Sequence, residues 1–502
     1  MSSVIESLRS QVAQHLNRTD VAATAILVVL LSSYLFHRSS WSGIKTTKID
    51  GPKGSNPIIG LSLALVKSEN PAATIETWAK EFGPVFSLPM GFGRTGLILA
   101  DVKAAAHFLA RDTGVYHQTR LTKIFIENLF GRGILWAEDE DHRRQRKALT
   151  PAFSISATRN YLSTFYDSAY KIKSNWETLL DNGNRTIEVQ AWILKFLQIF
   201  EAFERPESSG FVSQALFILA PIYPVLQRLP ARHNRMMKGI KASMAALADK
   251  IIHPDGRKGA ELADGGHGHV EKSIVGLLVK AETASDGLKM SEEEVLAEAM
   301  RPLQAALREE LSKFQARDPT WDELMALPYL NAITQETLRL HPPLPGVARM
   351  ASRDDAIPLG NPIRTPGGEV ISEIVVAKGT PVTCPVAYIN QSEDLWGPDA
   401  KEFKPVRWIE DESGKDGIGA GAKEIKGYHH LLTFSEGPRF CIGRNIAVGN
   451  FKATLSVLIR NFSFELPNGV DSKIARHKGL LARPKLEGEN GPKVPLVVKR
   501  LE

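Results

Sequence analysis

The chain has few cysteines and little excess charge, and each shortage excludes a class of protein. Its 502 residues contain two cysteines, Cys384 and Cys441, too few for a disulfide framework or for a zinc module built on four cysteines. The formal net charge is +6, from 62 basic and 56 acidic residues, and this mild excess does not argue for nucleic-acid binding. With 43% hydrophobic residues, the composition excludes a disordered chain and a polytopic membrane protein.

One uncharged apolar run near the N-terminus predicts a membrane anchor. Residues 21–36 carry no charge and would form ~24 Å of helix, short but workable for the thin bilayer of the endoplasmic reticulum. Lysines and arginines are more frequent after the run than before it, which favours a cytosolic position for the C-terminal side. A cleaved signal peptide and a buried core helix are the alternatives. We therefore expect a lumenal tail at 1–20, the anchor at 21–36, a stiff Pro/Gly hinge at 37–60 and the main domain at 61–502.

The rest of the sequence predicts a mainly α-helical domain with small β-sheets. Amphipathic periods, an acidic first turn, a capping box at Thr320–Glu323 and proline stops indicate the helices. The predicted helices cover residues 139–150, 231–253, 291 onward, 320–327, 330–340 and 444–458. Residues 369–388, rich in valine and isoleucine, are predicted to form edge-type strands, and residues 415–426 a surface loop.

The chemically distinctive segment surrounds Cys441. Residues 434–443 read as a glycine-turned loop that leads into a helix beginning near Arg444. Amide donors and the dipole at a helix start lower the pKa of a thiol, so Cys441 is a candidate nucleophile or metal ligand. An inert small core residue is the alternative for any single cysteine.

The complete pattern in this loop resembles the haem-binding loop of the cytochrome P450 family. Its five fixed positions, Phe-x-x-Gly-x-Arg-x-Cys-x-Gly, are filled by Phe434, Gly437, Arg439, Cys441 and Gly443. The resemblance implies that Cys441 is the axial thiolate ligand of the iron in haem b. It also implies that Arg439 pairs with a haem propionate and that the two glycines let the backbone approach the macrocycle.

Three further segments resemble the same family. Glu336 and Arg339 match its Glu-x-x-Arg pair, and Arg407 matches a downstream arginine, which implies a buried structural ion network behind the haem.

His142 and Arg146 match the family's Trp-x-x-x-Arg helix with histidine in place of tryptophan, and Arg349 lies where another propionate partner is frequent. A solvated basic face is the interpretation preferred for Arg143, Arg144 and Lys147, and it would steer an acidic flavin-bearing reductase.

One family motif is missing from the sequence. The family's long distal helix carries Ala/Gly-Gly-x-Asp/Glu-Thr-Thr/Ser, whose acid–alcohol pair relays the protons that cleave O2. Here Met300 passes through Pro302 directly into a stretch that matches the following helix, so about thirty to forty residues of typical family spacing are absent. Thr283 is a weak substitute for the pair, and a second shortening is expected near Ile199. The resemblance therefore implies an internally truncated P450 fold.

The resemblance implies a haem-thiolate monooxygenase that oxidises an apolar small molecule with O2 and electrons from an NADPH–cytochrome P450 reductase. Because the anchor, the hinge and the residues 150–153 are similar to fungal microsomal members, we expect the endoplasmic reticulum membrane and, by analogy, secondary metabolism. A peroxide-using or isomerising haem-thiolate enzyme, or an inactive haem-binding relic, is the alternative, since the proton-relay motif is absent.

Overall fold

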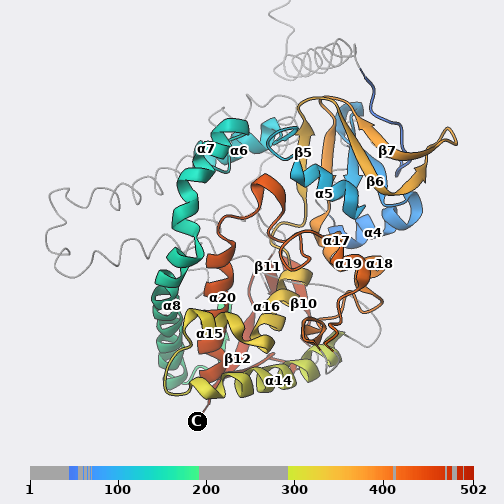
Figure 1. Cartoon of the computed structure of the whole chain (residues 1–502). Coiled ribbons are helices and arrows are strands. Elements are labelled where there is room, and N and C mark those ends of the chain that lie inside the picture. The colour runs from blue at the N-terminus through green and yellow to red at the C-terminus, as the bar shows by residue number, and fades with distance from the viewer. Residues whose placement is uncertain are drawn as a thin grey trace, which may run out of the picture.

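The computed structural model (Figure 1) describes a helical body with a β-rich region at one side. The described residues are 44–54, 60, 61, 65, 68, 70–190, 292–410, 414–469, 472–477, 483–489 and 491–501. The predicted anchor, the helix at 231–253, Thr283 and Ile199 therefore lie outside the described residues. No helix in this described part is long and apolar enough to cross a bilayer.

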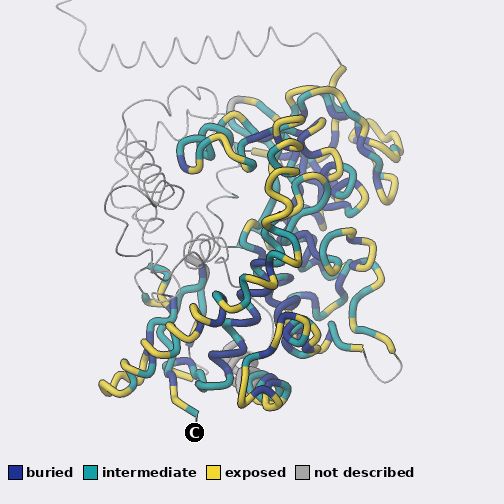
Figure 2. The backbone as a smooth tube through the Cα atoms, turned by 60° about the vertical axis from the view of Figure 1, so that its left-hand side comes forward, coloured by how far each residue is buried: buried dark blue, intermediate teal, exposed yellow. Residues whose placement is uncertain are grey.

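The helical region is built on one apolar cluster shared by five helices. They are α8 (Ile155–Asp181), α14 (Glu292–Leu311), α15 (Trp321–Ala326), α16 (Pro328–Leu340) and α20 (Arg444–Asn461). Phe165 of α8, Leu311 of α14 and Val457 of α20 belong to this buried cluster. Figure 1 shows α8 and α20 running side by side, and Figure 2 shows buried positions within the helical body. The helix that follows the cysteine loop is thus fixed by packing along its length.

The β-rich region contains a five-stranded mixed sheet with the order β1-β2-β8-β5-β3. Its strands are β1 (Val85–Pro89), β2 (Thr95–Leu99), β3 (Tyr116–His117), β5 (Val347–Ala351) and β8 (Pro381–Cys384). A separate hairpin pairs β6 (Asp355–Arg364) with β7 (Val370–Val376). Three strands, β4 (Thr186–Glu188), β9 (Phe462–Glu465) and β12 (Pro495–Arg500), form a third sheet, and β10 (Ile474–His477) pairs with β11 (Arg483–Leu486).

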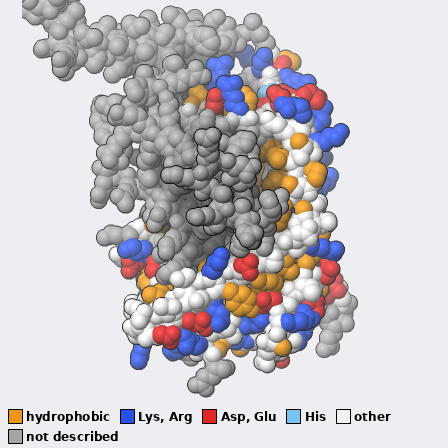
Figure 3. Space-filling model, turned by 90° about the vertical axis from the view of Figure 1, so that its left-hand side faces the viewer, with side chains coloured by type: hydrophobic (Ala, Val, Ile, Leu, Met, Phe, Trp, Pro, Cys, Tyr) orange, Lys and Arg blue, Asp and Glu red, His pale blue; other side chains and the backbone are white. Residues whose placement is uncertain are grey.

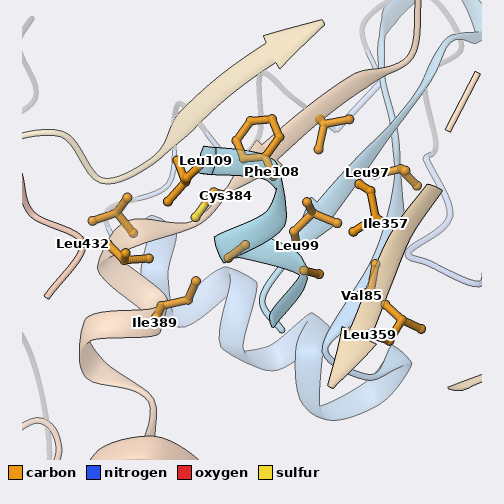
Figure 4. Packing of buried hydrophobic residues seen from close by; sticks show 14 of the residues in the cluster. Val85, Leu97, Leu99, Phe108, Leu109, Ile357, Leu359, Cys384, Ile389 and Leu432 are labelled. Carbon is orange, nitrogen blue, oxygen red and sulfur yellow. The ribbon is translucent and has the colours of Figure 1, made fainter. Parts of the chain in front are cut away.

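Helix α5 (Val102–Ala110) is the element of the β-rich region that reaches the cysteine loop. Asp101 caps its N-terminus by accepting a hydrogen bond from the Ala104 amide at 2.8 Å. Figure 4 shows Phe108 and Leu109 among the buried side chains that surround Leu99 and Cys384. Packing therefore fixes the C-terminal end of α5.

The remaining helices cover the sheet or precede the site. They are α4 (Pro71–Phe82), α6 (Arg120–Phe130), α7 (Asp139–Leu149), α17 (Val386–Gln391), α18 (Glu393–Trp396) and α19 (Ala420–Lys423). Short 3-10 turns cover η1 (Gly91–Gly93), η2 (Thr150–Phe153), η6 (Ser312–Phe314), η7 (Pro405–Trp408) and η8 (Gly437–Arg439). Basic and acidic side chains are interspersed on the described surface in Figure 3, in keeping with the small net charge.

Most helix predictions are confirmed. Helix α7 ends one residue before Thr150, and α15 carries the predicted capping box, in which Thr320 and Glu323 bond each other's backbone amides. Helix α14 begins at Glu292 and α20 extends past the predicted end at residue 458. The predicted interruption at Pro328 is confirmed: α15 ends at Ala326, and Pro328 begins α16 because proline fits the first helical turn.

Two predictions about irregular or edge structure are wrong. The sequence predicts edge strands over 369–388, yet β8 is the central strand, paired with β2 on one side and β5 on the other. Its proline is tolerated because Pro381 is the first residue of the strand. The predicted surface loop at 415–426 contains α19, and both Ala422 and Ile425 are buried in the β-rich core.

The described part of the predicted hinge is docked onto the hairpin region. Thr47 exchanges two hydrogen bonds with Val375: its amide donates to the Val375 carbonyl, and its hydroxyl accepts from the Val375 amide, both at 2.9 Å. Ile49 is buried with the β-rich core. Residues 47–49 are therefore fixed against the domain.

A single buried carboxylate, that of Glu336, holds the segment behind the cysteine loop together. Arg339 donates from Nε and Nη2 to its two oxygens at 2.8 and 2.9 Å, and Arg407 donates from Nε at 3.0 Å. The Trp408 indole and the Lys404 amide donate to it at 2.9 and 2.8 Å. The structure thus brings Glu336, Arg339 and Arg407 together, and none of the three side chains is more than 1% exposed.

Every charged group of this network has hydrogen-bond partners. Buried charges are tolerated in a protein when they are paired in this way. Arg339 also donates to the carbonyls of Asn390 and Glu402, at 3.0 and 3.1 Å, and to that of Ala400. Burial alone would raise the pKa of Glu336, but the hydrogen bonds and charges of the two arginines outweigh it and lower the pKa.

We predict that Glu336→Gln destabilises the fold strongly, because it removes the counter-charge of the buried Arg339 and leaves the buried Arg407 with Asp399 as its carboxylate partner. Removing one partner of a buried ion pair costs about 3–5 kcal/mol. Chemical denaturation of the purified variant measures this loss. Glu140→Gln is the control, since Glu140 pairs with Arg143 on the surface and its side chain is 79% exposed. Equal stability of the two variants would contradict the prediction.

Candidate functional site

The cysteine loop is a tight turn fixed by its own backbone. The Cys441 amide donates to the Phe434 carbonyl at 2.8 Å, and the Phe440 amide donates to the Gly437 carbonyl at 3.1 Å. The Phe434 ring stands edge-on to Tyr428 with 5.7 Å between centroids. These contacts set where the thiol emerges before α20 begins.

Gly437 is required because another element approaches its backbone closely. Its φ is +69°, and a Cβ there would lie 2.3 Å from the Leu109 carbonyl oxygen at the end of α5. Any side chain would displace the loop from this helix, since that distance is far inside van der Waals contact. Gly443 differs, because its nearest neighbour lies 3.8 Å away on Phe153.

The Cys441 thiol is accessible and lies beside two arginines. The residue is exposed in the chain itself, and the positive charges of Arg146 and Arg444 act on its thiol. The Arg146 guanidinium lies 4.0 Å from the centre of the Phe440 ring, and that of Arg444 lies 4.5 Å from the centre of Tyr428.

The expectation of a lowered thiol pKa is wrong for the chain alone. The surrounding protein desolvates Cys441 and raises its pKa, and the Gly443 amide and the two arginines offset only part of that rise. The residue is accessible on one side and enclosed on the others, which reconciles its exposure with this desolvation. A stronger cation than these two arginines, placed at the open side of the thiol, would be needed to keep Cys441 in the thiolate form.

The predicted propionate partners gather along one wall beside the loop. His142 of α7 is 3% exposed, and the charges of Arg439 and Arg146 act on it. Arg439 donates from Nη2 to the Glu138 carboxylate and to the Ala137 carbonyl. The wall therefore combines guanidinium groups with a buried imidazole.

Arg349 of β5 is held from behind by a carboxylate. Its Nε and Nη2 donate to the two Asp112 oxygens, each at 2.9 Å, and its Nη1 donates to the Ala348 carbonyl. Asp112 also lies 3.3 Å from Nε of Arg439. The sequence interpretation missed both Asp112 and Glu138, because no pattern links Asp112 to an arginine 237 positions away.

The region of the missing distal motif is bridged by continuous helix. Helix α14 runs from Glu292 to Leu311 with Pro302 inside it, across the junction at which the motif was expected. Thr283, the weak substitute, lies outside the described residues.

Comparison with known proteins decides the family. The cytochrome P450 family model matches residues 50–306 and 301–489. The chain belongs to the cytochrome P450 family. It is 41% and 40% identical to the cytochrome P450 monooxygenases claP and claQ of Ampulloclitocybe clavipes, each over 91% of this chain and 94% of the relative. It is 28% identical to the ganoderic acid synthetase of Ganoderma lucidum, over 77% of this chain and 82% of the relative.

Membership makes the chain an oxidoreductase of the haem-monooxygenase type. Members of the family hold haem iron through a thiolate ligand, act on small molecules and receive electrons from a redox partner. These relatives are named as monooxygenases or synthetases of fungi, which agrees with the fungal resemblance of the sequence.

The alignments also show that the relatives carry extra positions. The alignment to claP spans 513 positions but takes in 91% of 502 residues, about 457, so about 56 positions of the relative have no counterpart here. The two matched segments of the family model meet within α14.

The residues of the site fit a haem group. An accessible thiol at one place, and guanidiniums with a buried neutral imidazole along a neighbouring wall, suit a metal macrocycle that carries two carboxylates. The Arg349 guanidinium keeps N–H groups on the edge opposite Asp112, so the wall retains donors for an added anion.

We predict that His142 makes stability depend on pH in the acidic range. Burial, with the charges of Arg439 and Arg146, lowers the pKa of His142 to about 4, although Asp112 opposes the shift. The unfolded chain binds this proton near pH 6.5, so between about 6.5 and about 4 it holds more protons than the folded chain. The contribution of His142 to the free energy of unfolding should be constant above this pH range and should fall as the pH drops through it.

His142→Gln should flatten that fall, because glutamine is similar in size and does not titrate. Thermal unfolding of the haem-free wild type and the haem-free variant between about pH 4.5 and about pH 7.5 measures the difference, because a propionate bound beside His142 would itself raise the pKa of His142. Parallel profiles over the whole range would show that His142 does not contribute.

Proposed function

We propose that this chain is a membrane-anchored haem-thiolate monooxygenase in which Cys441 would supply the thiolate ligand of haem b iron. It would insert one oxygen atom of O2 into an apolar small molecule, with electrons from an NADPH–cytochrome P450 reductase. The observation that carries the proposal is the accessible Cys441 thiol, presented by a loop that Gly437 seats on α5 beside a cationic wall.

Each site residue has a role that follows from its surroundings. Arg349, Arg439 and His142 would hold the two propionates, and Arg146 and Arg444 would offset the negative charge of the thiolate. A bound haem would supply the oxygen-activating chemistry, and the Cys441 thiolate would donate electron density to its iron. The Glu336 network behind the loop fixes its position and is structural.

The substrate class rests on the relatives. They are named as fungal monooxygenases and, in one case, as a ganoderic acid synthetase. We propose for this chain an apolar small molecule of fungal secondary metabolism, by analogy with them.

We predict that Cys441→Ala abolishes the thiolate signature in the carbon-monoxide difference spectrum of the reduced protein, because no other thiol lies at the site. Cys384→Ala is the matched control. Cys384 is fully buried in the β-rich core, and burial raises its pKa to about 12, so it stays a neutral thiol. The control should keep the signature, and its retention in Cys441→Ala would overturn the ligand assignment.

A second candidate is a peroxide-using or isomerising haem-thiolate enzyme. The continuous helix α14 and the missing alignment positions favour it, because they suggest an internal shortening where the proton relay belongs. Turnover with hydrogen peroxide but not with O2, NADPH and a reductase would favour this candidate over the monooxygenase. A chain with the thiolate signature that turns over with neither would be a haem-binding relic.

The reductase is proposed to dock at the thiolate side, where α7 ends. Arg143 and Arg144 are exposed, but each pairs with an acidic neighbour in the same helix, Glu140 and Asp141. The predicted basic face is therefore weaker than the sequence indicates, and Lys147 carries an exposed charge beside it.

We predict that deleting residues 1–43 releases the protein from microsomes into the soluble fraction without changing its melting temperature. The deletion removes the apolar run at 21–36 but keeps Thr47 and Ile49, which dock the hinge. Deleting residues 1–50 as a comparison should also lower the melting temperature. Retention of the shorter deletion on microsomes would show that the run is not the sole anchor.

A further inference from the structure

Asp112 is a buried carboxylate between Arg349 and Arg439, two arginines that come from different elements of the site. It follows α5, and its side chain is fully shielded from solvent. It receives both side-on hydrogen bonds of Arg349 from β5 and lies 3.3 Å from Nε of Arg439 in the cysteine loop. Three segments distant in sequence therefore meet at one carboxylate.

The way in which Arg349 is held determines what its other edge can do. A guanidinium has five N–H groups in one plane, and Nε with one Nη2 hydrogen are used on Asp112. The Nη1 group donates to the Ala348 carbonyl at 2.9 Å. One hydrogen on each terminal nitrogen is left on the edge that faces away from Asp112.

Arg439 is held differently, and most of its donors are used within the protein. Its Nη2 bonds Glu138 and the Ala137 carbonyl, and its Nη1 lies 3.5 Å from the Ile134 carbonyl. Its Nε faces Asp112. Arg439 thus links the cysteine loop to the segment before α7, and Arg349 has the freer edge for an added anion.

We infer that Asp112 is a positioning residue for the haem carboxylates: it fixes the free edge of Arg349 toward them and holds Arg439 and the cysteine loop in register. Its negative charge also acts on His142 and offsets part of the positive charge of the wall. Groups that lie behind the residues contacting a cofactor orient those residues and tune the electronic properties of the cofactor. The inference rests on the proposed function, because it presumes that haem binds at this wall.

The test replaces Asp112 by asparagine, which keeps the shape and loses the charge. Without the charge-assisted pairs, the Arg349 guanidinium is no longer fixed, and haem transfer to apomyoglobin should be about tenfold faster. Loss of a nearby negative charge stabilises the reduced iron, so the reduction potential should shift to a more positive value. Asp112→Glu keeps the charge and should hold the potential close to the wild-type value.

Asp355→Asn is the matched control. Asp355 is a buried carboxylate near the same end of α5, and it is bonded by Tyr116 at 2.8 Å, by His107 at 2.9 Å and by Arg111. None of these partners belongs to the site, and the Asp355 side chain is 4% exposed. This variant should lower the melting temperature but leave haem release and the potential unchanged.

The outcomes separate a positioning role from a structural one. Faster haem release and a positive potential shift in Asp112→Asn, absent from Asp355→Asn, support the inference. Equal haem release in the two variants, or an unchanged potential in Asp112→Asn, overturns it. If Asp112→Asn does not fold, Asp112→Glu is compared with an Arg349→Lys variant. A reduction potential that shifts as far in Asp112→Glu as in Arg349→Lys then overturns the inference. A wild-type protein without the thiolate signature would be a failure of the proposed function and not of this step.

Discussion

The buried carboxylate of Glu336 is the contact on which the cysteine-bearing half of the molecule depends. It joins α16 to the 3-10 turn η7 through two arginines, and Arg339 passes the connection to the carbonyls of Asn390 and Glu402. These charges tolerate burial because every one of them has a partner. Because this network fixes the segment behind the cysteine loop, the short loop keeps its shape and its thiol stays accessible.

The site also pairs buried charges, but there the pairing positions groups for binding. In the Glu336 network, opposite charges cancel almost completely, and this pairing makes the segment rigid. Along the wall of Arg349, Arg439 and His142, the carboxylates of Asp112 and Glu138 balance the two arginines and His142 is neutral. An added anion would therefore be held by the N–H groups that Arg349 keeps free and by the nearby charge of Arg146. The end of α5 links the two functions, because Gly437 rests on the Leu109 carbonyl and Asp112 anchors the arginines.

The chain belongs to the cytochrome P450 family, and its alignment to claP leaves about 56 positions of that relative without a counterpart. The relatives align over nearly their whole length, and the haem-thiolate loop is intact around the cysteine. The two matched segments of the family model meet within α14, where the distal motif is expected. A loss at that place would leave the cysteine loop and the arginines beside it unchanged and would remove the residues expected to deliver protons to oxygen, which is why the reaction and the cofactor are separate questions for this chain.

The sequence alone determined the local features: the cysteine loop, the capping box at Thr320, the Glu336–Arg339 pair and the helix limits, because each depends on residues a few positions apart. The sequence also indicated the protein family. Only the tertiary structure decided the central place of β8 and the contacts of Asp112, since both depend on partners hundreds of residues away in the chain. It decided the direction of the Cys441 pKa shift too, because desolvation depends on everything that packs around the thiol and not on the helix that follows it.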